Sequence, residues 1–449
     1  MLCAIPIEIF AREMDGALYL ALHLAARGMP TILGERMVDR YVLESRSPVA
    51  YFDSDHSQFN DAQVLARGGM VFDLHPEGLN LLDSPQVLTK YLNMAPKVSH
   101  LCTWGEGQAD HVRQALPSDL RGVVRATGHP SFDLTSERFV PYYRDESIVR
   151  EHGEDFLLIN TNFSYYNHIM GLDRYVEMLG KTTGQEIFNT PEHLAFVRSL
   201  ASYQAQLLEP FVELARTLAT AFPERHVILR PHPTEGHDYY KSRLGDLPNV
   251  FVKHSGSVRQ WIASAGAVIH HDCTSGVEAL LMGRLTIQYR PVFDAEIAST
   301  IPALAGLELE DAASVVDAVR AGSMPQAKFE EQIGTLKPYF ANLARPASRT
   351  LAQLAGAFGP EGGKTDLPRP LGLWRRLGCW RKHLSKVIRA HQPGSNGKKV
   401  RYALGKFPRI APREIESRLD ALRRCEPELP RVRLEALALN TFLVVPEAC

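Results

Sequence analysis

The feature of this sequence that most constrains its fold is a regular alternation of short apolar runs with helical segments. Residues 3–9 (CAIPIEI) have a strand-like pattern, residues 18–28 (LYLALHLAARG) repeat apolar residues at helical spacing, and residues 30–35 form a second strand-like run. A strand–helix–strand unit joins two parallel strands, because parallel strands need a long crossover connection. The N-terminal segment therefore predicts a parallel sheet.

The same alternation continues in two successive series. In the first, further strands are expected at residues 49–52, 70–74, 100–104 and 123–128. In the second, strands are expected at 156–163, 226–233, 250–254, 267–272 and 285–291, and helices at 192–222, 257–265 and 275–283. Two such series predict an α/β fold of two Rossmann-like domains facing a cleft, at residues 1–140 and 151–350. This is the GT-B arrangement, which glycosyltransferases, epimerases and phosphorylases share.

Composition excludes several classes of protein. A chain of 449 residues with 45% hydrophobic and 22% charged residues can bury real cores, which excludes general disorder. The 50 basic and 51 acidic residues exclude a nucleic-acid-like excess of positive charge. The six cysteines are scattered without a CxxC pair, no run of about 18 apolar residues occurs, and the N-terminus lacks a signal-peptide pattern. We therefore expect a soluble protein of the reducing cytoplasm.

Positive charge is concentrated near the C-terminus. Residues 366–413 contain thirteen Lys or Arg and one acidic residue, a local charge of +12, after a Gly- and Pro-rich linker at 356–370. We expect residues 366–449 to be a basic extension with its own partner. Trp374 and Trp380, with leucines among the basic residues, favour contact with an anionic membrane surface. The alternatives are a basic helix packed on the acidic body and, less favoured, RNA binding, for which no motif is present.

Two polar motifs follow neighbouring strands of the second series. The first is Arg230-Pro231-His232-Pro233, and the second runs from Cys273 through Thr274, Ser275 and Gly276 to Glu278. Ligands of parallel sheets lie at the carboxyl ends of strands, so we expect both motifs at one site.

Each motif residue has an expected role in binding a nucleotide. Thr274, Ser275 and Gly276 would open a helix at a phosphate. His232 would donate to that phosphate and neutralise a departing nucleotide, and Glu278 would hold ribose hydroxyls. The alternative is a pair of ordinary strand–helix turns, with Ser275 as a helix cap.

The His-Pro motif followed by a Ser/Thr motif resembles CMP-sugar-using GT-B enzymes, which include bacterial sialyltransferases and Kdo transferases. Residues 6–28, 128–134 (GHPSFDL), 157–168, 230–235 and 270–291 are more narrowly similar to the bacterial surface carbohydrate biosynthesis family, which is related to retaining β-Kdo transferases. The resemblance covers residues 3–345. It implies that His232, Thr274 and Ser275 contact the CMP phosphate and that Glu278 contacts the ribose.

Charged residues follow the first strand. They are Glu8, Arg12, Glu13 and Asp15. Arg12 could hold the carboxylate of a 2-ulosonic acid such as Kdo, and Glu13 could act as acid or base at the acceptor hydroxyl. The alternative is a solvated helix start, because acidic side chains favour the first turn of a helix.

Further candidates lie at other strand ends. Asp272 could attack the anomeric carbon as a nucleophile, or could merely cap a helix. Asn160, Asn162 and Asn167 could donate to sugar or phosphate. The doublet Asp53-Ser54-Asp55 resembles the metal site of a GT-A transferase, but a CMP-sugar has one phosphate and can be bound without metal. We expect no metal and no cofactor.

Together these patterns predict a glycosyltransferase that moves a CMP-activated ulosonic acid, with Kdo as the first candidate, to a surface polysaccharide or glycolipid. Its partners would be the CMP-sugar donor, the saccharide or glycolipid acceptor and an anionic inner-membrane surface, but no nucleic acid. The alternatives are a CDP-polyol phosphotransferase, a sugar-nucleotide 2-epimerase and a non-catalytic factor of surface-glycan assembly.

Overall fold

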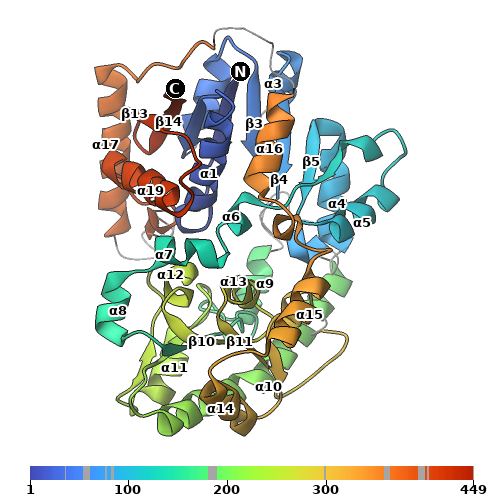
Figure 1. Cartoon of the computed structure of the whole chain (residues 1–449), viewed down its shortest axis with the longest axis vertical. Helices are drawn as coiled ribbons and strands as arrows, with labels where there is room; N and C mark the ends of the chain where they lie inside the picture. Colours follow the sequence, from blue (N-terminus) through green and yellow to red (C-terminus); the bar gives the residue numbers. More distant parts are fainter. Residues whose placement is uncertain are drawn as a thin grey trace. The chain divides into compact units, whose positions relative to one another are not determined.

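The chain consists of two compact α/β units. The computed structural model describes residues 1–35, 37–53, 61–75, 78–81, 85–179, 190–297, 300–357, 365–392, 400–401 and 404–447. Unit 1 comprises Met1–Leu134 and Lys337–Cys449, and unit 2 comprises Thr135–Leu336 (Figure 1). The expected α/β class with two Rossmann-like units is confirmed, because each unit contains a parallel sheet with helical crossovers.

Unit 1 is built on a sheet whose order is β13-β14-β2-β1-β3-β4-β5-β6 among the described residues. Its strands are β1 (Leu2–Pro6), β2 (Thr31–Gly34), β3 (Val49–Asp53), β4 (Met70–Leu74), β5 (His100–Thr103), β6 (Val124–Ala126), β13 (Val432–Ala438) and β14 (Thr441–Pro446). β1 to β6 run parallel to one another, whereas β14 is antiparallel to β2 and β13 is antiparallel to β14.

Helices connect and cover these strands. They are α1 (Phe10–Ala25), α2 (Met37–Glu44), α3 (Asp61–Ala66), α4 (Pro85–Met94), α5 (Glu106–Ala115), α6 (Pro130–Asp133), α16 (Ala347–Gly356), α17 (Leu373–Ala390) and α19 (Pro412–Cys425). α1 contacts α6, α16 and α19, which explains why nearly all of its side chains after Met14 are buried (Figure 1).

The C-terminal extension does not form a separate module. Its strands β13 and β14 complete the unit 1 sheet, and Leu437 and Leu443 belong to the same apolar cluster as Leu2 of β1. The hairpin between the two strands turns at Asn440, which has φ of 54°. A Cβ atom at Gly34 would lie 2.0 Å from the carbonyl oxygen of Asn440, so only glycine allows this approach.

The unit boundaries differ from those expected at residues 140 and 350, because the chain returns to unit 1 at Lys337. The buried carboxylate of Asp133 explains this return. It accepts hydrogen bonds from the backbone N–H groups of Ala347 (2.6 Å) and Ser348 (2.8 Å) at the start of α16, and from the amide of Asn342 (2.6 Å). The GHPSFDL segment is thereby attached to residues that follow it by more than 200 positions.

Unit 2 is built on a fully parallel sheet of order β12-β11-β10-β7-β8-β9. Its strands are β7 (Phe156–Asn160), β8 (Val227–Arg230), β9 (Val250–Val252), β10 (Ala265–His270), β11 (Leu285–Tyr289) and β12 (Leu307–Leu309). Its helices are α7 (Val140–Tyr143), α8 (Glu146–His152), α9 (Leu172–Leu179), α10 (Pro191–Ala221), α11 (His237–Leu244), α12 (Val258–Ile262), α13 (Thr274–Leu281), α14 (Ala312–Ala321) and α15 (Gln326–Leu336).

The long helix α10 forms much of the unit 2 core. It begins where the Thr190 side chain accepts a hydrogen bond from the N–H of His193, with Pro191 at the first helical position. Phe211, Leu214 and Leu218 are fully buried against the sheet strands in one cluster. Each such side chain stabilises the fold by about 1.5–3 kcal/mol.

Candidate functional site

Three strands of unit 2 end side by side in polar residues. β7 ends at Asn160, β8 at Arg230 and β10 at His270. The Cα atom of Asn160 is a register partner of both Arg230 and His270, so the three side chains project from the same face of the sheet. The strand order also reverses at β7, because β8 and β9 lie on one side and β10 to β12 on the other. Ligands of open α/β sheets bind at such reversals.

Arg230 is a buried cation at this edge, with 7% of its surface exposed. Its Nη1 donates to Nδ1 of His254 (2.9 Å) and its Nη2 donates to the carbonyl of Gly256 (2.8 Å). Within the described part of the chain its Nε has no hydrogen-bond partner, and no carboxylate pairs with the guanidinium. Burial lowers the pKa of Arg230 to about 10, so it stays charged at neutral pH. A buried charge without a counter-ion is costly, and an anion would stabilise it.

The loop after β8 is held by a buried carboxyl that sequence reasoning missed. Glu235 accepts hydrogen bonds from the hydroxyl of Thr161 (2.9 Å), the N–H of His232 (2.9 Å) and the hydroxyl of Tyr240. Burial raises the pKa of Glu235, and these hydrogen bonds partly oppose the rise. Glu235 thus ties the end of β7 to the loop that carries His232. The position of Glu235, two residues after the His-Pro pair, could have identified it as part of this loop. No local sequence pattern indicates that its carboxyl is buried.

His232 is neutral rather than cationic. Its Nδ1 accepts the N–H of Thr234 (3.4 Å) and lies 2.9 Å from the hydroxyl of the same residue, which places the ring proton on Nε2. Burial lowers the pKa of His232 to about 4. The ring can therefore donate one hydrogen bond near pH 7, but it does not supply the positive charge that the sequence analysis expected. Arg230 supplies that charge.

α13 begins directly after β10 and is attached to β7. The amide of Asn160 donates to Oγ of Ser275 (3.0 Å), while Oδ1 of Asn160 is buried without a partner among the described residues. The N-cap of α13 is Cys273, so Ser275 is not the cap that the alternative interpretation required. Thr274 is half-buried at the first helical position. The first turn of α13 starts at the same strand edge as Asn160, and in it the N–H of Gly276 donates to the carbonyl of Cys273 (2.9 Å).

Gly276 is required by the close approach of α13 to β10. A Cβ atom there would lie 2.1 Å from Nε2 of His270. The His270 ring is fully buried, and its Nε2 donates to the carbonyl of Ala305 (2.8 Å).

Glu278 lies in a buried ion pair. Both Nη2 (2.6 Å) and Nε (3.1 Å) of Arg259 donate to its Oε1, and Arg259 also contacts the hydroxyl of Tyr143. This pairing leaves only Oε2 of Glu278 for a ribose hydroxyl, whereas the sequence analysis expected an open carboxylate for two.

Asp272 is turned toward β11 by hydrogen bonds. Its Oδ1 accepts the amide of Gln288 (3.0 Å), its N–H donates to the same side chain, and Arg290 lies 3.9 Å away. Its φ of 45° is unusual for a residue other than glycine. Asn162 is half-buried, and its carbonyl accepts the amide of Gln204.

In unit 1 the four charged residues after β1 are brought together and largely neutralised. Glu13 accepts the N–H of Glu8 (2.9 Å) and the guanidinium of Arg12 (2.8 Å). The remaining two acids pair with the C-terminal extension, and these pairs are Glu8–Lys406 and Asp15–Arg418 (both 2.6 Å). Sequence reasoning did not foresee these partners.

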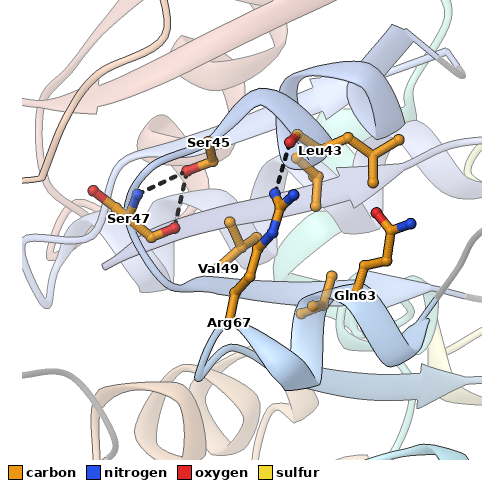
Figure 2. Close-up of a pocket in the computed structure, with 8 residues that line it drawn as sticks. Leu43, Ser45, Ser47, Val49, Gln63 and Arg67 are labelled. Atoms are coloured by element: carbon orange, nitrogen blue, oxygen red, sulfur yellow. Dashed lines mark hydrogen bonds between the residues drawn. The ribbon is translucent and has the colours of Figure 1, made fainter.

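The Asp53-Ser54-Asp55 doublet and a small pocket also belong to unit 1. Ser54 and Asp55 of the doublet lie outside the described residues, and the described part of the chain holds no group of three potential metal ligands. Figure 2 shows a pocket of unit 1 where Arg67 donates to the carbonyl of Leu43 (2.7 Å) and Ser45 bonds the backbone of Ser47. None of the residues that line this pocket is a candidate identified from the sequence.

Comparisons with known proteins give only weak similarity. No protein-family model matches the chain, and no curated protein matches it. Among solved structures, the wall teichoic acid polymerase TagF is 9% identical, with a TM-score of 0.44 over 69% of this chain and 72% of its own. A putative UDP-N-acetylglucosamine 2-epimerase from Listeria monocytogenes is 11% identical, with a TM-score of 0.48 over 82% of this chain and 99% of its own. The UDP-GlcNAc 2-epimerase from Neisseria meningitidis is 11% identical, with a TM-score of 0.47 over 78% and 98%. Similarity at this level assigns no activity to the chain.

Proposed function

We propose that the chain is a glycosyltransferase whose unit 2 binds the phosphate of a CMP-activated ulosonic acid, with Kdo as the first candidate donor. The acceptor in this proposal is a bacterial surface polysaccharide or glycolipid. The observation that carries the proposal is Arg230, a buried cation at a strand end that has no carboxylate partner among the described residues. The choice of CMP rests on the resemblance of the His-Pro and Ser/Thr motifs to those of CMP-sugar-using enzymes.

The charges at this edge favour a donor with one phosphate. The phosphodiester of a CMP-sugar carries one negative charge, which one guanidinium and a helix N-terminus of about half a positive charge can balance. His232 adds a neutral donor at Nε2. A nucleoside diphosphate carries more negative charge, so the CDP-polyol and UDP-sugar alternatives are less well matched.

In the proposed reaction the bond between the anomeric carbon and the phosphate oxygen breaks, and its electron pair leaves with CMP. The acceptor hydroxyl oxygen forms the new bond to the anomeric carbon, directly or by displacing an adduct on Asp272, and its proton passes to Glu13. Arg230 would offset the charge that grows on the leaving phosphate. Oε2 of Glu278 would accept a ribose hydroxyl, and Asn160 and Asn162 would contact sugar or phosphate. Arg12 would bind the donor carboxylate, which requires it to exchange its contact with Glu13.

A thermal-shift panel of CMP, CDP, UDP and GDP tests the donor class. Saturation at 100 times Kd stabilises a protein by about 2.7 kcal/mol, which raises the Tm of a unit of this size by roughly 5–10 °C. CMP should give this shift without divalent metal. A much larger shift with CDP or UDP would contradict the assignment.

Arg230→Met tests the site itself. This variant should lose the CMP shift and keep the Tm of the unliganded protein, because removing a buried unpaired charge lifts a desolvation cost. Arg320→Ala is the matched control, since it removes a cation of unit 2 on the exposed helix α14. A CMP shift that persists in Arg230→Met would refute the site.

The two carboxylates proposed for catalysis have separate tests. If Asp272 is the nucleophile, incubation with donor alone should give an adduct one sugar heavier by intact-protein mass spectrometry, and Asp272→Asn should abolish it. If Glu13 is the acid or base, Glu13→Gln should still bind CMP and lose transfer by about 10² or more. Full activity of Asp272→Asn would show that Asp272 is not the nucleophile.

A further inference from the structure

Helix α17 presents its large apolar side chains to solvent. The exposed fractions are 70% for Leu373, 84% for Trp374, 49% for Leu377, 43% for Trp380, 55% for Leu384 and 59% for Ile388. Among the described side chains of α17, the least exposed are smaller or more polar, namely Cys379, His383, Val387 and Ala390. Of these, Cys379 packs against the unit 1 core. This is the reverse of an ordinary surface helix, which buries its large apolar residues.

The exposed side chains form one stripe. Leu373, Leu377, Trp380, Leu384 and Ile388 follow one another at intervals of three or four residues, so they share a face about 100° wide. The line of less exposed residues has the same spacing and lies beside this face. α17 (Figure 1) therefore rests on unit 1 by a narrow edge and leaves the apolar stripe, named here the α17 stripe, exposed over most of its length. The guanidinium of Arg409 stacks on the ring of Trp380, which is still 43% exposed.

The charges around the α17 stripe decide what covers it. α17 contains six Lys or Arg and no acidic residue, and no acidic residue occurs anywhere between positions 367 and 413. Arg375, Lys382, Lys386 and Arg389 lie on the side of the helix opposite the stripe. A homodimer through the stripe would leave these basic side chains without anionic partners, whereas an anionic surface would pair with them.

We propose that α17 binds in the plane of an anionic lipid bilayer, with the α17 stripe in the acyl boundary and the basic side chains at the phosphates. An amphipathic helix with Trp and Leu on one face and Lys and Arg on the other binds membranes in this way, and each basic residue near an anionic surface strengthens binding by about fivefold. No described helix is long and apolar enough to cross the bilayer.

Flotation of the full chain with vesicles tests this proposal, and it needs no nucleotide, so its outcome is independent of the proposed function. The chain should float with vesicles of phosphatidylcholine and phosphatidylglycerol (about 7:3) and not with phosphatidylcholine alone. Binding should fall at least tenfold as salt rises, because salt screens surface charge. The double variant Leu377→Glu/Leu384→Glu should lose binding by more than tenfold while keeping its Tm, since both side chains are exposed.

Ile169→Glu/Phe196→Glu is the matched control. It adds the same two charges at exposed apolar positions of unit 2 and should bind vesicles like the wild type. The proposal is overturned if Leu377→Glu/Leu384→Glu still floats, or if neutral vesicles in high salt bind equally well. It is also overturned if sedimentation shows that the wild type is a dimer that this variant dissociates without any binding to vesicles, because the stripe would then be a contact between two copies of the chain.

Discussion

Substitution of Gly276 by alanine should separate α13 from β10 and destabilise unit 2. The new Cβ atom would lie 2.1 Å from Nε2, 2.2 Å from Cε1 and 2.5 Å from Cδ2 of His270. The ring cannot rotate away at low cost, because it is fully buried and Nε2 donates to the carbonyl of Ala305. Overpacking of this kind costs about 1–3 kcal/mol, and loss of the hydrogen bond adds about 1 kcal/mol. We expect a total loss of about 2–4 kcal/mol.

Urea unfolding of the full chain, followed by circular dichroism, measures this loss. The midpoint of the unit 2 transition should fall by about 1 M in Gly276→Ala, for a slope of 2–3 kcal/mol per molar urea. Gly378→Ala is the matched control. It lies inside α17 with nothing within 4 Å of its Cβ position, so the helix should gain about 0.5–1 kcal/mol. If Gly276→Ala were as stable as the wild type, the packing of α13 on His270 would not be what requires glycine.

Three further outcomes are expected. Arg259→Met should destabilise unit 2 by about 3–5 kcal/mol in chemical unfolding, because it leaves the buried Glu278 carboxylate without its cationic partner. The double variant Arg259→Met/Glu278→Gln should recover most of that loss. Burial lowers the folded-state pKa of His270 to about 4, below its unfolded value of 6.5. The unfolded chain therefore binds this proton first, and melting at a series of pH values should show stability lost as pH falls from 6.5 to 4. His270 should contribute about 3 kcal/mol of that loss, and His270→Gln should reduce it accordingly. Lys406→Ala should cost under 1 kcal/mol and lower the Tm more at low salt than at high salt, because its pair with Glu8 is partly exposed.

Most parallel strands were predictable because their signal is local, although the short β12 (Leu307–Leu309) was not among the expected strands. Runs such as residues 70–74 and 285–291 contain β4 and β11, and the mostly helical segment 192–222 is α10. β13 and β14 were not predicted, although apolar residues around a turn at Asn440 mark a hairpin. Their place in unit 1 depends on the edge of β2, which lies about 400 residues earlier in the chain. No local pattern carries that information.

The location of the candidate site could be predicted from the sequence, but the roles of its individual residues could be predicted less well. Because the carboxyl ends of parallel strands meet at one edge, the two motifs carrying Arg230 and Ser275 could be placed together from sequence. The protonation of His232 and the pairing of Glu278 with Arg259 could not, since both depend on burial and on side chains from other elements. The same holds for Glu235, whose three hydrogen-bond donors come from the loop after β8, from α11 and from the segment after β7.

The hairpin of β13 and β14 also sets an order of events during protein synthesis. Unit 2 is one continuous stretch, and its last residue, Leu336, is added to the chain while more than a hundred residues of unit 1 remain to be translated. Until Thr441–Pro446 has emerged, β2 presents an unpaired edge with free backbone N–H and C=O groups. A nascent chain arrested before that point would carry a completed unit 2 sequence beside an unfinished sheet that is open to pairing with other chains.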